Sequence, residues 1–147
     1  MTASDFQTDL VLTGIGIAPY SSRALNHQLT PIASAVSLRR DINGTLVDLS
    51  ESQFRKYRLT IRGSDAQPPA LNGIWPGMAV TVDCAMELAY EDTTDGAPDR
   101  TAVPGSTRTA DGYVYYRPRL SMLVVDCPQS FAEWDCETGW SIVLEEV

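Results

Sequence analysis

The segment from Leu38 to Gly63 constrains the fold of this 147-residue chain more than any other part of the sequence. Within it, the dipeptide Asn43-Gly44 lies between two short runs that contain strand-forming residues. Asn-Gly supplies the positive φ that both central positions of a type I′ turn require, so we predict a β-hairpin with this turn. We expect the whole segment to fold as a unit and to form the wall of a small barrel.

Two further signals follow the hairpin in the same segment. Ser50 and Gln53 have the S-x-x-Q spacing of a capping box, which predicts a short helix. We expect Phe54 and Tyr57 to lie on one face of this helical turn and to pack on the barrel. The stretch 58–62 then alternates polar and apolar residues, which predicts a strand with its apolar side chains inward and its cations outward.

The same alternation, which is typical of half-buried strands, occurs elsewhere in the chain. The longest run covers residues 80–90 and predicts one antiparallel strand. The stretch 113–127 is rich in strand-forming residues and predicts a further strand, with Pro118 marking a bulge or an edge. The stretch 139–144 predicts a closing strand in which Trp140, Ile142 and Leu144 share one face. We therefore predict a mainly β fold, which is an antiparallel β-barrel, a split barrel or a sandwich with one short helix and a long polar loop.

The length of the chain indicates a single domain over residues 1–147. Residues 1–12 have no clear period, and we predict that they form a flexible N-terminus. Residues 91–112 are polar and lack apolar periodicity, so we predict an extended loop or an arm that becomes ordered on a neighbour. Trp75 is expected to anchor the proline-rich loop 64–77 over one end of the barrel.

The residues that bind metals or form disulfides are too sparse to indicate such a site. The three cysteines form neither a disulfide framework nor a CxxC pair, and we expect them to be reduced thiols: Cys84, Cys127 and Cys136. The only histidine, His27, lies in a stretch, 21–32, that favours a strand, with no nucleophile or carboxylate placed beside it. We predict no metal site and no cofactor.

The acidic residues give no stronger indication of catalysis. Glu133 and Asp135 flank Trp134, whereas the acid pair of a glycosidase normally comes from separate elements across a groove. Neighbouring acids on a surface strand are the simpler interpretation. We predict no catalytic residues and no enzyme activity.

The distribution of charge suggests an assembly interface. The formal net charge of −8 argues against non-specific nucleic-acid binding, because such binding needs cations to displace counterions from phosphates. Six of the eleven basic residues nevertheless fall in the segment 38–63. Because complementary patches steer association, we favour contact with an acidic copy of this chain or of a sister protein. The predicted interface consists of Arg39, Arg40, Arg55, Lys56, Arg58 and Arg62.

The sequence also lacks the usual signals for export or membrane insertion. Its first twenty residues have neither a basic n-region nor a continuous apolar h-region, so no signal peptide is expected. No run of about 18 apolar residues is present, so no membrane-spanning segment is expected.

The chain resembles minor tail proteins of long-tailed bacteriophages, in the class of distal tail (Dit-like) and related tail-tip ring proteins. The resemblance is carried by PYSSRALNHQLTPI (19–32), LRRDINGTLVDLS (38–50), FRKYRLTIRG (54–63), WPGMAVTVDC (75–84), YRPRLSMLVVD (116–126) and WSIVLEEV (140–147). These segments cover most of the chain outside the polar loop. The family has no catalytic residues to transfer to this sequence.

The resemblance implies a structural subunit of the virion that is assembled in the host cytoplasm. Six copies would form a ring at the distal end of the tail, which joins the tail tube to the hub and tip proteins. DNA or the tape-measure protein would pass through the lumen without specific binding. At this length we do not expect the large C-terminal insert or carbohydrate module that longer distal tail proteins carry.

A second hypothesis starts from the aromatic residues. A small carbohydrate-binding β-sandwich of a phage adhesion device would use exposed aromatic side chains to stack on sugar rings. The candidates are Trp75, Trp134 and the tyrosines of 113–116.

Overall fold

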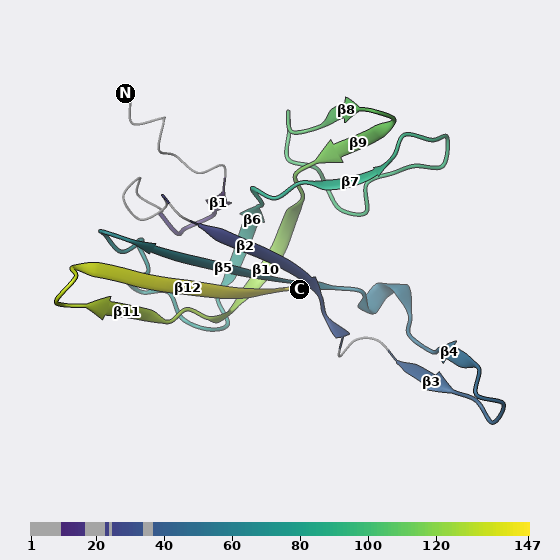
Figure 1. Ribbon diagram of the computed structural model, residues 1–147, viewed down its shortest axis with the longest axis horizontal. Helices are drawn as coiled ribbons and strands as arrows, with labels where there is room; N and C mark the ends of the chain where they lie inside the picture. Colours follow the sequence, from purple (N-terminus) through teal and green to yellow (C-terminus); the bar gives the residue numbers. More distant parts are fainter. Residues whose placement is uncertain (1–9, 17–22, 24, 34–36) are drawn as a thin grey trace.

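The computed structural model describes residues 10–16, 23, 25–33 and 37–147. Strands account for 50% of the chain and helix for 3%, and the main sheet is an antiparallel half-barrel (Figure 1). The predicted mainly β fold is therefore confirmed. Within the described residues, no helix has the length and apolar character needed to cross a membrane.

Strands and the 3₁₀ turn η4 follow one another in the part of the chain that the structure describes. In order they are β1 (Val11–Leu12), β2 (Asn26–Pro31), β3 (Leu38–Arg40), β4 (Leu46–Asp48), η4 (Ser52–Phe54), β5 (Tyr57–Asp65), β6 (Ala79–Asp83), β7 (Leu88–Glu91), β8 (Arg108–Ala110), β9 (Tyr113–Tyr116), β10 (Arg119–Asp126), β11 (Gln129–Ala132) and β12 (Glu137–Glu146).

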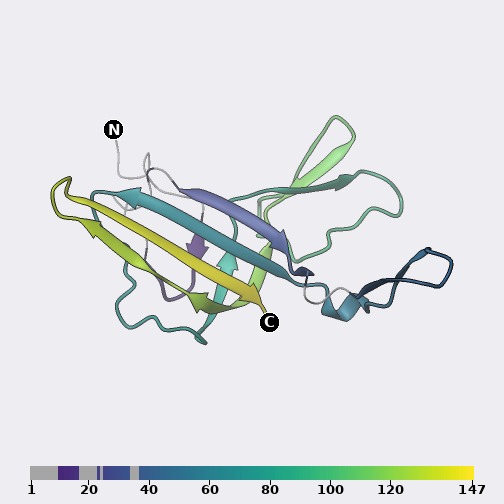
Figure 2. The same ribbon diagram turned by 60° about the horizontal axis from the view of Figure 1, so that its bottom comes forward.

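Seven of these strands form the half-barrel, in the order β1-β6-β10-β12-β5-β2, with β11 also paired to β12. In Figures 1 and 2, β2, β5 and β12 run side by side while β6 and β10 cross behind them. The long strand β12 links the two sets of strands, because the second half of one of its edges pairs with β10 and the first half pairs with β11. The register of β10 shifts between Val124 and Asp126, and an irregularity of this kind bends a strand.

The core lies on one face of the half-barrel, where alternate residues of the strands are buried. Leu59 and Ile61 of β5 and Trp140, Ile142 and Leu144 of β12 all point into it, as their alternation predicts. The remaining buried members of this cluster come from the other strands and from the loops: Leu10, Leu12, Ile15, Leu71, Val80, Val82, Cys84, Leu120, Met122 and Val124.

The predicted hairpin is present, but its turn is not type I′. β3 pairs with β4, with Arg40 opposite Leu46, and the loop between them contains one residue with positive φ, Gly44 at 82°. The amide of Gly44 donates to the carbonyl of Asp41 (3.0 Å), and the Asp41 carboxylate accepts the amides of Asn43 (2.8 Å) and Thr45 (2.9 Å). Asp41 and Thr45 are hydrogen-bonded across the hairpin, so the loop between them has three residues and ends in a left-handed glycine. The two hydrogen bonds that the Asp41 carboxylate accepts stabilise this loop.

The capping-box prediction is wrong, although a helical turn does follow the hairpin. Ser50 turns back to the carboxylate of Asp48, and η4 begins after Glu51 without a side-chain cap. The side chain of Gln53 donates to Glu51 (2.7 Å) instead of closing the box. The Ser50 hydroxyl donates to Asp48, two residues earlier, and this local hydrogen bond takes the place of a cap on η4.

The single long strand predicted for 80–90 is also wrong. β6 ends at Asp83, and the chain turns before β7 joins a separate three-stranded sheet in the order β7-β9-β8. Cys84 continues the alternation because its side chain is buried, and its amide donates to the carbonyl of Pro118 (3.1 Å) outside the sheet. Alternating burial therefore persists through a change of sheet.

The N-terminus and two loops differ in part from their predicted states. Residues 1–9 lie outside the described residues, but Leu10 is buried and β1 pairs with β6, so this part of the predicted flexible N-terminus is incorporated into the fold. The polar stretch 91–112 is partly a strand, since it contains β8. Trp75 does not anchor its loop, because its side chain is largely exposed.

The predicted strand at 21–32 is present as β2, which pairs with β5 and includes His27. Residues 21, 22 and 24 lie outside the described part of the chain. Burial lowers the pKa of the His27 imidazole, which fits a side chain on the inner face of an edge strand.

Candidate functional site

A hairpin arm, defined as residues Leu38–Lys56, projects from one end of the half-barrel (Figure 1). Every residue from Leu38 to Leu49 is exposed. The prediction that this segment forms part of the barrel wall is therefore wrong for the hairpin. It holds only for β5, which follows the arm.

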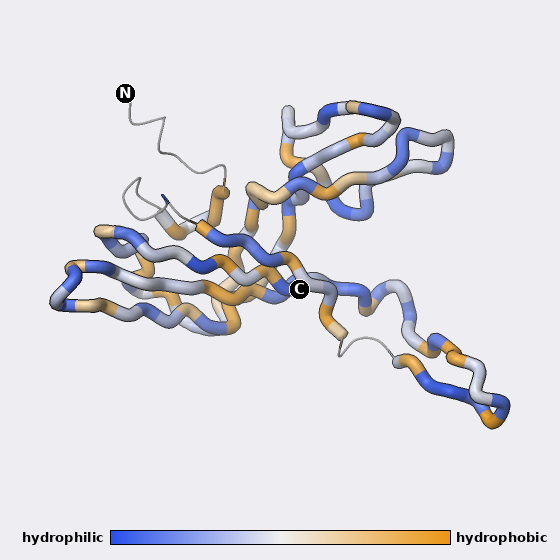
Figure 3. The backbone as a smooth tube through the Cα atoms, in the orientation of Figure 1, coloured by the Kyte–Doolittle hydropathy of each residue, from blue (hydrophilic) through white to orange (hydrophobic). Residues whose placement is uncertain are grey.

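The arm exposes large apolar side chains to solvent, and Figure 3 shows apolar stretches along it interrupted by hydrophilic ones. Ile42, at the end of the hairpin, is fully exposed. The other exposed apolar residues of the arm are Leu38, Leu46, Val47, Leu49 and Phe54. Phe54 thus does not pack on the barrel as predicted, whereas Tyr57 is partly buried against the core.

An isolated two-stranded hairpin is at best marginally stable in water. β3 and β4 pair only with each other among the described strands, so both of their outer edges are free. Six exposed apolar side chains on an arm built around this hairpin are more than scattered surface residues. The arm therefore has the properties of a surface that becomes stable when it docks on a partner.

The charge of the arm differs from that of the rest of the molecule. It carries four basic and three acidic side chains, whereas the remainder of the chain carries seven basic and sixteen acidic ones. The cross-strand register places Leu38, Arg40, Leu46 and Asp48 on one face of the hairpin and Arg39 with Val47 on the other. Apolar and basic groups are therefore mixed on both faces.

The structure divides the six basic residues of the predicted interface between two places. Arg39, Arg40, Arg55 and Lys56 belong to the arm, whereas Arg58 and Arg62 lie on the outer face of β5. Arg58 is engaged within the sheet, since its Nε donates to the carboxylate of Glu145 at 2.9 Å. Their joint role in assembly remains a prediction.

The base of the arm is held by Arg100, a residue that the sequence did not single out. Its Nε and Nη2 donate to the two carboxylate oxygens of Glu146, at 2.7 and 3.1 Å, and Nη2 also donates to the carbonyl of Arg55 at 2.7 Å. The guanidinium carbon lies 5.1 Å from the centre of the Tyr57 ring. Arg100 thus joins the polar loop, the start of β5 and the end of β12 to the base of the arm.

The electrostatics of this base follow from the same contacts. Hydrogen bonding to Glu146 raises the pKa of the Arg100 guanidinium, which therefore stays charged. Burial raises the pKa of the Tyr57 hydroxyl, with a further contribution from Asp99. A pocket lies beside these residues, and its lining includes Pro31, Ile32, Ser52, Arg55, Lys56, Tyr57, Asp99 and Arg100.

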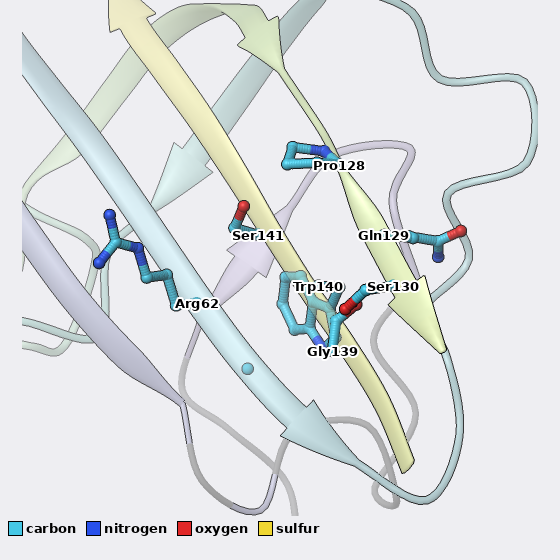
Figure 4. Close-up of a pocket in the computed structure, with 8 residues that line it drawn as sticks. Arg62, Pro128, Gln129, Ser130, Gly139, Trp140 and Ser141 are labelled. Atoms are coloured by element: carbon cyan, nitrogen blue, oxygen red, sulfur yellow. The ribbon is translucent and has the colours of Figure 1, made fainter. Parts of the chain in front are cut away.

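A second pocket, of about 310 Å³, lies along β12 and is lined mainly by polar and small residues (Figure 4). Figure 4 shows Arg62 of β5 and Gln129 of β11 on either side of Trp140. A Cβ atom added at Gly63 would come within 2.8 Å of the Trp140 indole, so the glycine allows that ring to be buried. Arg62 is the one charged residue of this lining, and no acid–base pair faces the space.

At the opposite end of the molecule from the arm, β11 and β12 are joined by a turn that exposes two aromatic side chains. We call residues Phe131–Glu137 the tryptophan turn. Trp134 is almost fully exposed, and Phe131 is largely exposed. Glu133, Asp135 and Glu137 make this segment acidic, and it contains no basic residue.

The described residues contain no group of three or more histidine, cysteine, aspartate or glutamate side chains placed to hold a metal ion. Glu133 and Asp135 lie exposed in the tryptophan turn. Burial raises the pKa of the Cys84 thiol to about 12, which makes this cysteine a poor nucleophile. The absence of enzyme activity and of cofactors remains a prediction.

Comparison with known proteins gives no relative for this chain. No family model matches it, and neither the curated proteins nor the solved structures contain a significant match.

Proposed function

We propose that this protein is a structural subunit of an oligomeric assembly in a bacteriophage tail, and that the arm is its principal assembly contact. The observation that carries the proposal is the projecting arm, whose six large apolar side chains are exposed in the isolated chain. Their burial against a neighbouring subunit would supply the stability that a lone hairpin lacks.

The place of the subunit is proposed from the resemblance in sequence pattern. A ring of copies at the distal tail end, six in the tail-tip proteins it resembles, would join the tail tube to the hub and tip proteins. The mainly β half-barrel is compatible with such a ring. A net charge of −8 suits a lumen through which DNA or a tape-measure protein passes without sticking.

The oligomeric part of this proposal can be tested with purified protein. Native mass spectrometry and light scattering of the full chain should give a multimer, and Leu46→Ser in the arm should shift it to smaller species without lowering the melting temperature. Val125→Ser is a matched control, because Val125 is an exposed apolar strand residue outside the arm. A wild-type chain that stays monomeric at high concentration would contradict the proposal.

The tail assignment needs a separate test. Mass spectrometry of purified phage particles from the source of this sequence should detect the protein at a fixed copy number relative to the tail tube protein. Its absence from intact particles would overturn the assignment to the tail, even if the purified chain forms a multimer.

The exposure of Trp75 and Trp134 favours a second candidate, a carbohydrate-binding module of a phage adhesion device. Exposed aromatic rings stack on sugars, but these two belong to separate segments, the loop before β6 and the tryptophan turn. A glycan array should show binding that Trp75→Ala or Trp134→Ala abolishes. An array without binding would remove this candidate.

A further inference from the structure

We propose that the arm docks on the tryptophan turn of a second copy of this chain, so that the subunits associate head to tail. This inference rests on the proposed role of the arm in assembly and names the surface that receives it. Trp134 and Phe131 would be the apolar anchors, and the acidic side chains between and beside them would face the basic groups of the arm.

The two surfaces complement each other in chemistry. The arm combines exposed Leu38, Ile42 and Leu46 with Arg39 and Arg40. The tryptophan turn combines two exposed aromatic rings with three carboxylates. Interfaces are typically anchored by tryptophan and arginine, and opposite charges around an apolar centre guide the approach and fix the register.

The backbone offers a further point of contact. Among the described strands, β11 pairs only with β12, so one edge of β11 has free amide and carbonyl groups. All four residues of β11 are exposed, and a pocket lined by Ala66, Pro68, Gln129, Ser130, Phe131 and Thr138 lies beside this strand. A strand of the arm could add to this edge and place apolar side chains in the pocket.

The positions of the two surfaces determine the kind of assembly. In Figures 1 and 2 the arm and the tryptophan turn lie at opposite ends of the long axis of the molecule. Complementary surfaces at opposite ends generate a heterologous contact, which forms a closed ring if the rotation between subunits closes and a filament if it does not. A contact between two arms would instead bring together surfaces of the same excess charge.

A mixing experiment distinguishes this arrangement from other modes of association. One variant carries Ile42→Asp in the arm, and the other carries Trp134→Asp in the tryptophan turn. Each should fail to form the wild-type multimer on its own, with association weakened about 30-fold or more, as expected for loss of a central anchor. Mixed in equal amounts, they should form a one-to-one dimer and nothing larger, because each pair retains a single intact contact.

Trp75→Asp is the matched control, since Trp75 is exposed but lies outside both surfaces. It should assemble like the wild type, and all three variants should keep the wild-type melting temperature because their side chains are exposed. If the wild-type chain assembles and Ile42→Asp does not, yet Trp134→Asp assembles normally, the tryptophan turn is not the receiving surface. A monomeric wild type would instead refute the proposed function. Binding of the arm to added DNA in place of a second copy would also overturn this inference.

Discussion

Replacing Arg100 by methionine tests whether the contacts at the base of the arm stabilise the fold. The substitution keeps part of the apolar stem and removes the hydrogen bonds of the guanidinium to Glu146, to the carbonyl of Arg55 and to Asp99, as well as the contact with the Tyr57 ring. It also leaves the carboxylate of Glu146 with the amide of Tyr57 as its remaining donor (3.0 Å).

The expected loss follows from the burial of the pair. Breaking a fully buried ion pair costs about 3–5 kcal/mol, because one charge is left without a partner. The side chains of Arg100 and Glu146 are 20% and 11% exposed, so water can reach part of the stranded carboxylate. We therefore expect Arg100→Met to lower the free energy of unfolding by about 2–3 kcal/mol.

Urea unfolding monitored by tryptophan fluorescence and circular dichroism measures this loss. Arg108→Met is a matched control, because Arg108 also donates to both oxygens of a carboxylate, that of Glu87, and lies 4.3 Å from the Tyr115 ring. That pair is 57% and 36% exposed, so solvent screens it and its loss should cost clearly less than the loss of the Arg100 pair.

A double-mutant cycle separates the ion pair from the other contacts of Arg100. Glu146→Gln in the Arg100→Met background removes the stranded charge and should recover part of the lost stability. Equal losses in Arg100→Met and Arg108→Met, or a loss below about 0.5 kcal/mol for Arg100→Met, would refute the reasoning from burial.

Other predictions concern the titrating side chains. Hydrogen bonding to Arg23 lowers the pKa of the Asp65 carboxyl to about 2. The interaction of ionised Asp65 with Arg23 stabilises the fold fully above the ordinary pKa of 3.8, and this stabilisation is lost as the pH falls toward 2. Arg23→Met should therefore flatten the decline in the free energy of unfolding between pH 5 and pH 2. Burial lowers the pKa of His27, so below pH 6.5 the unfolded chain binds a proton there more readily than the folded one. The free energy of unfolding should therefore decline as the pH falls below 6.5. His27→Gln should reduce the slope measured between pH 7 and pH 5, and an unchanged slope would contradict this. In the native protein, maleimide should label the exposed Cys136 and spare Cys84, whose thiol is buried with a pKa of about 12. Mass spectrometry before and after unfolding in urea checks this, and rapid labelling of Cys84 in the native state would contradict the packing.

The sequence predicts best where local pattern and tertiary burial coincide. Leu59 and Ile61 of β5 and Trp140, Ile142 and Leu144 of β12 are buried on one face, as their alternation indicates. These two strands are neighbours at the centre of the half-barrel, with Ile61 directly opposite Ile142. Central strands are buried on a single face along their whole length, so a period of two carries through each of them.

Alternation fails to reveal where a strand changes its partner. Residues 80–90 keep one pattern of burial while the chain passes from β6, beside β10, to β7, beside β9. The even-numbered residues stay buried or half-buried on both sides of this change of partner, and their period does not show which strand lies beside them. Hydrogen-bond partners come from distant segments, which a local pattern does not identify.

Local signals also identified the hairpin without identifying its environment. Asn43-Gly44 indicates a hairpin whether or not anything packs on it, so combining the hairpin, the helical turn and the following strand into one barrel wall went beyond what the local signal contains. Those residues are exposed in the single chain. The role of Arg100 had no local signal at all, because its partner Glu146 is 46 positions away and the stretch around it has no apolar periodicity.

The distribution of charge bears on which contacts between copies are favourable. Outside the arm the chain has nine more acidic than basic side chains, so two copies that approach by these surfaces repel each other. The arm has one more basic than acidic side chain, and its approach to the acidic remainder of a neighbour is attractive. An exposed apolar hairpin with free edges would otherwise be a site of unspecific aggregation. Repulsion between the bodies of the subunits leaves contacts through the arm as the favoured ones, which links the excess of negative charge to the ordered assembly that we propose.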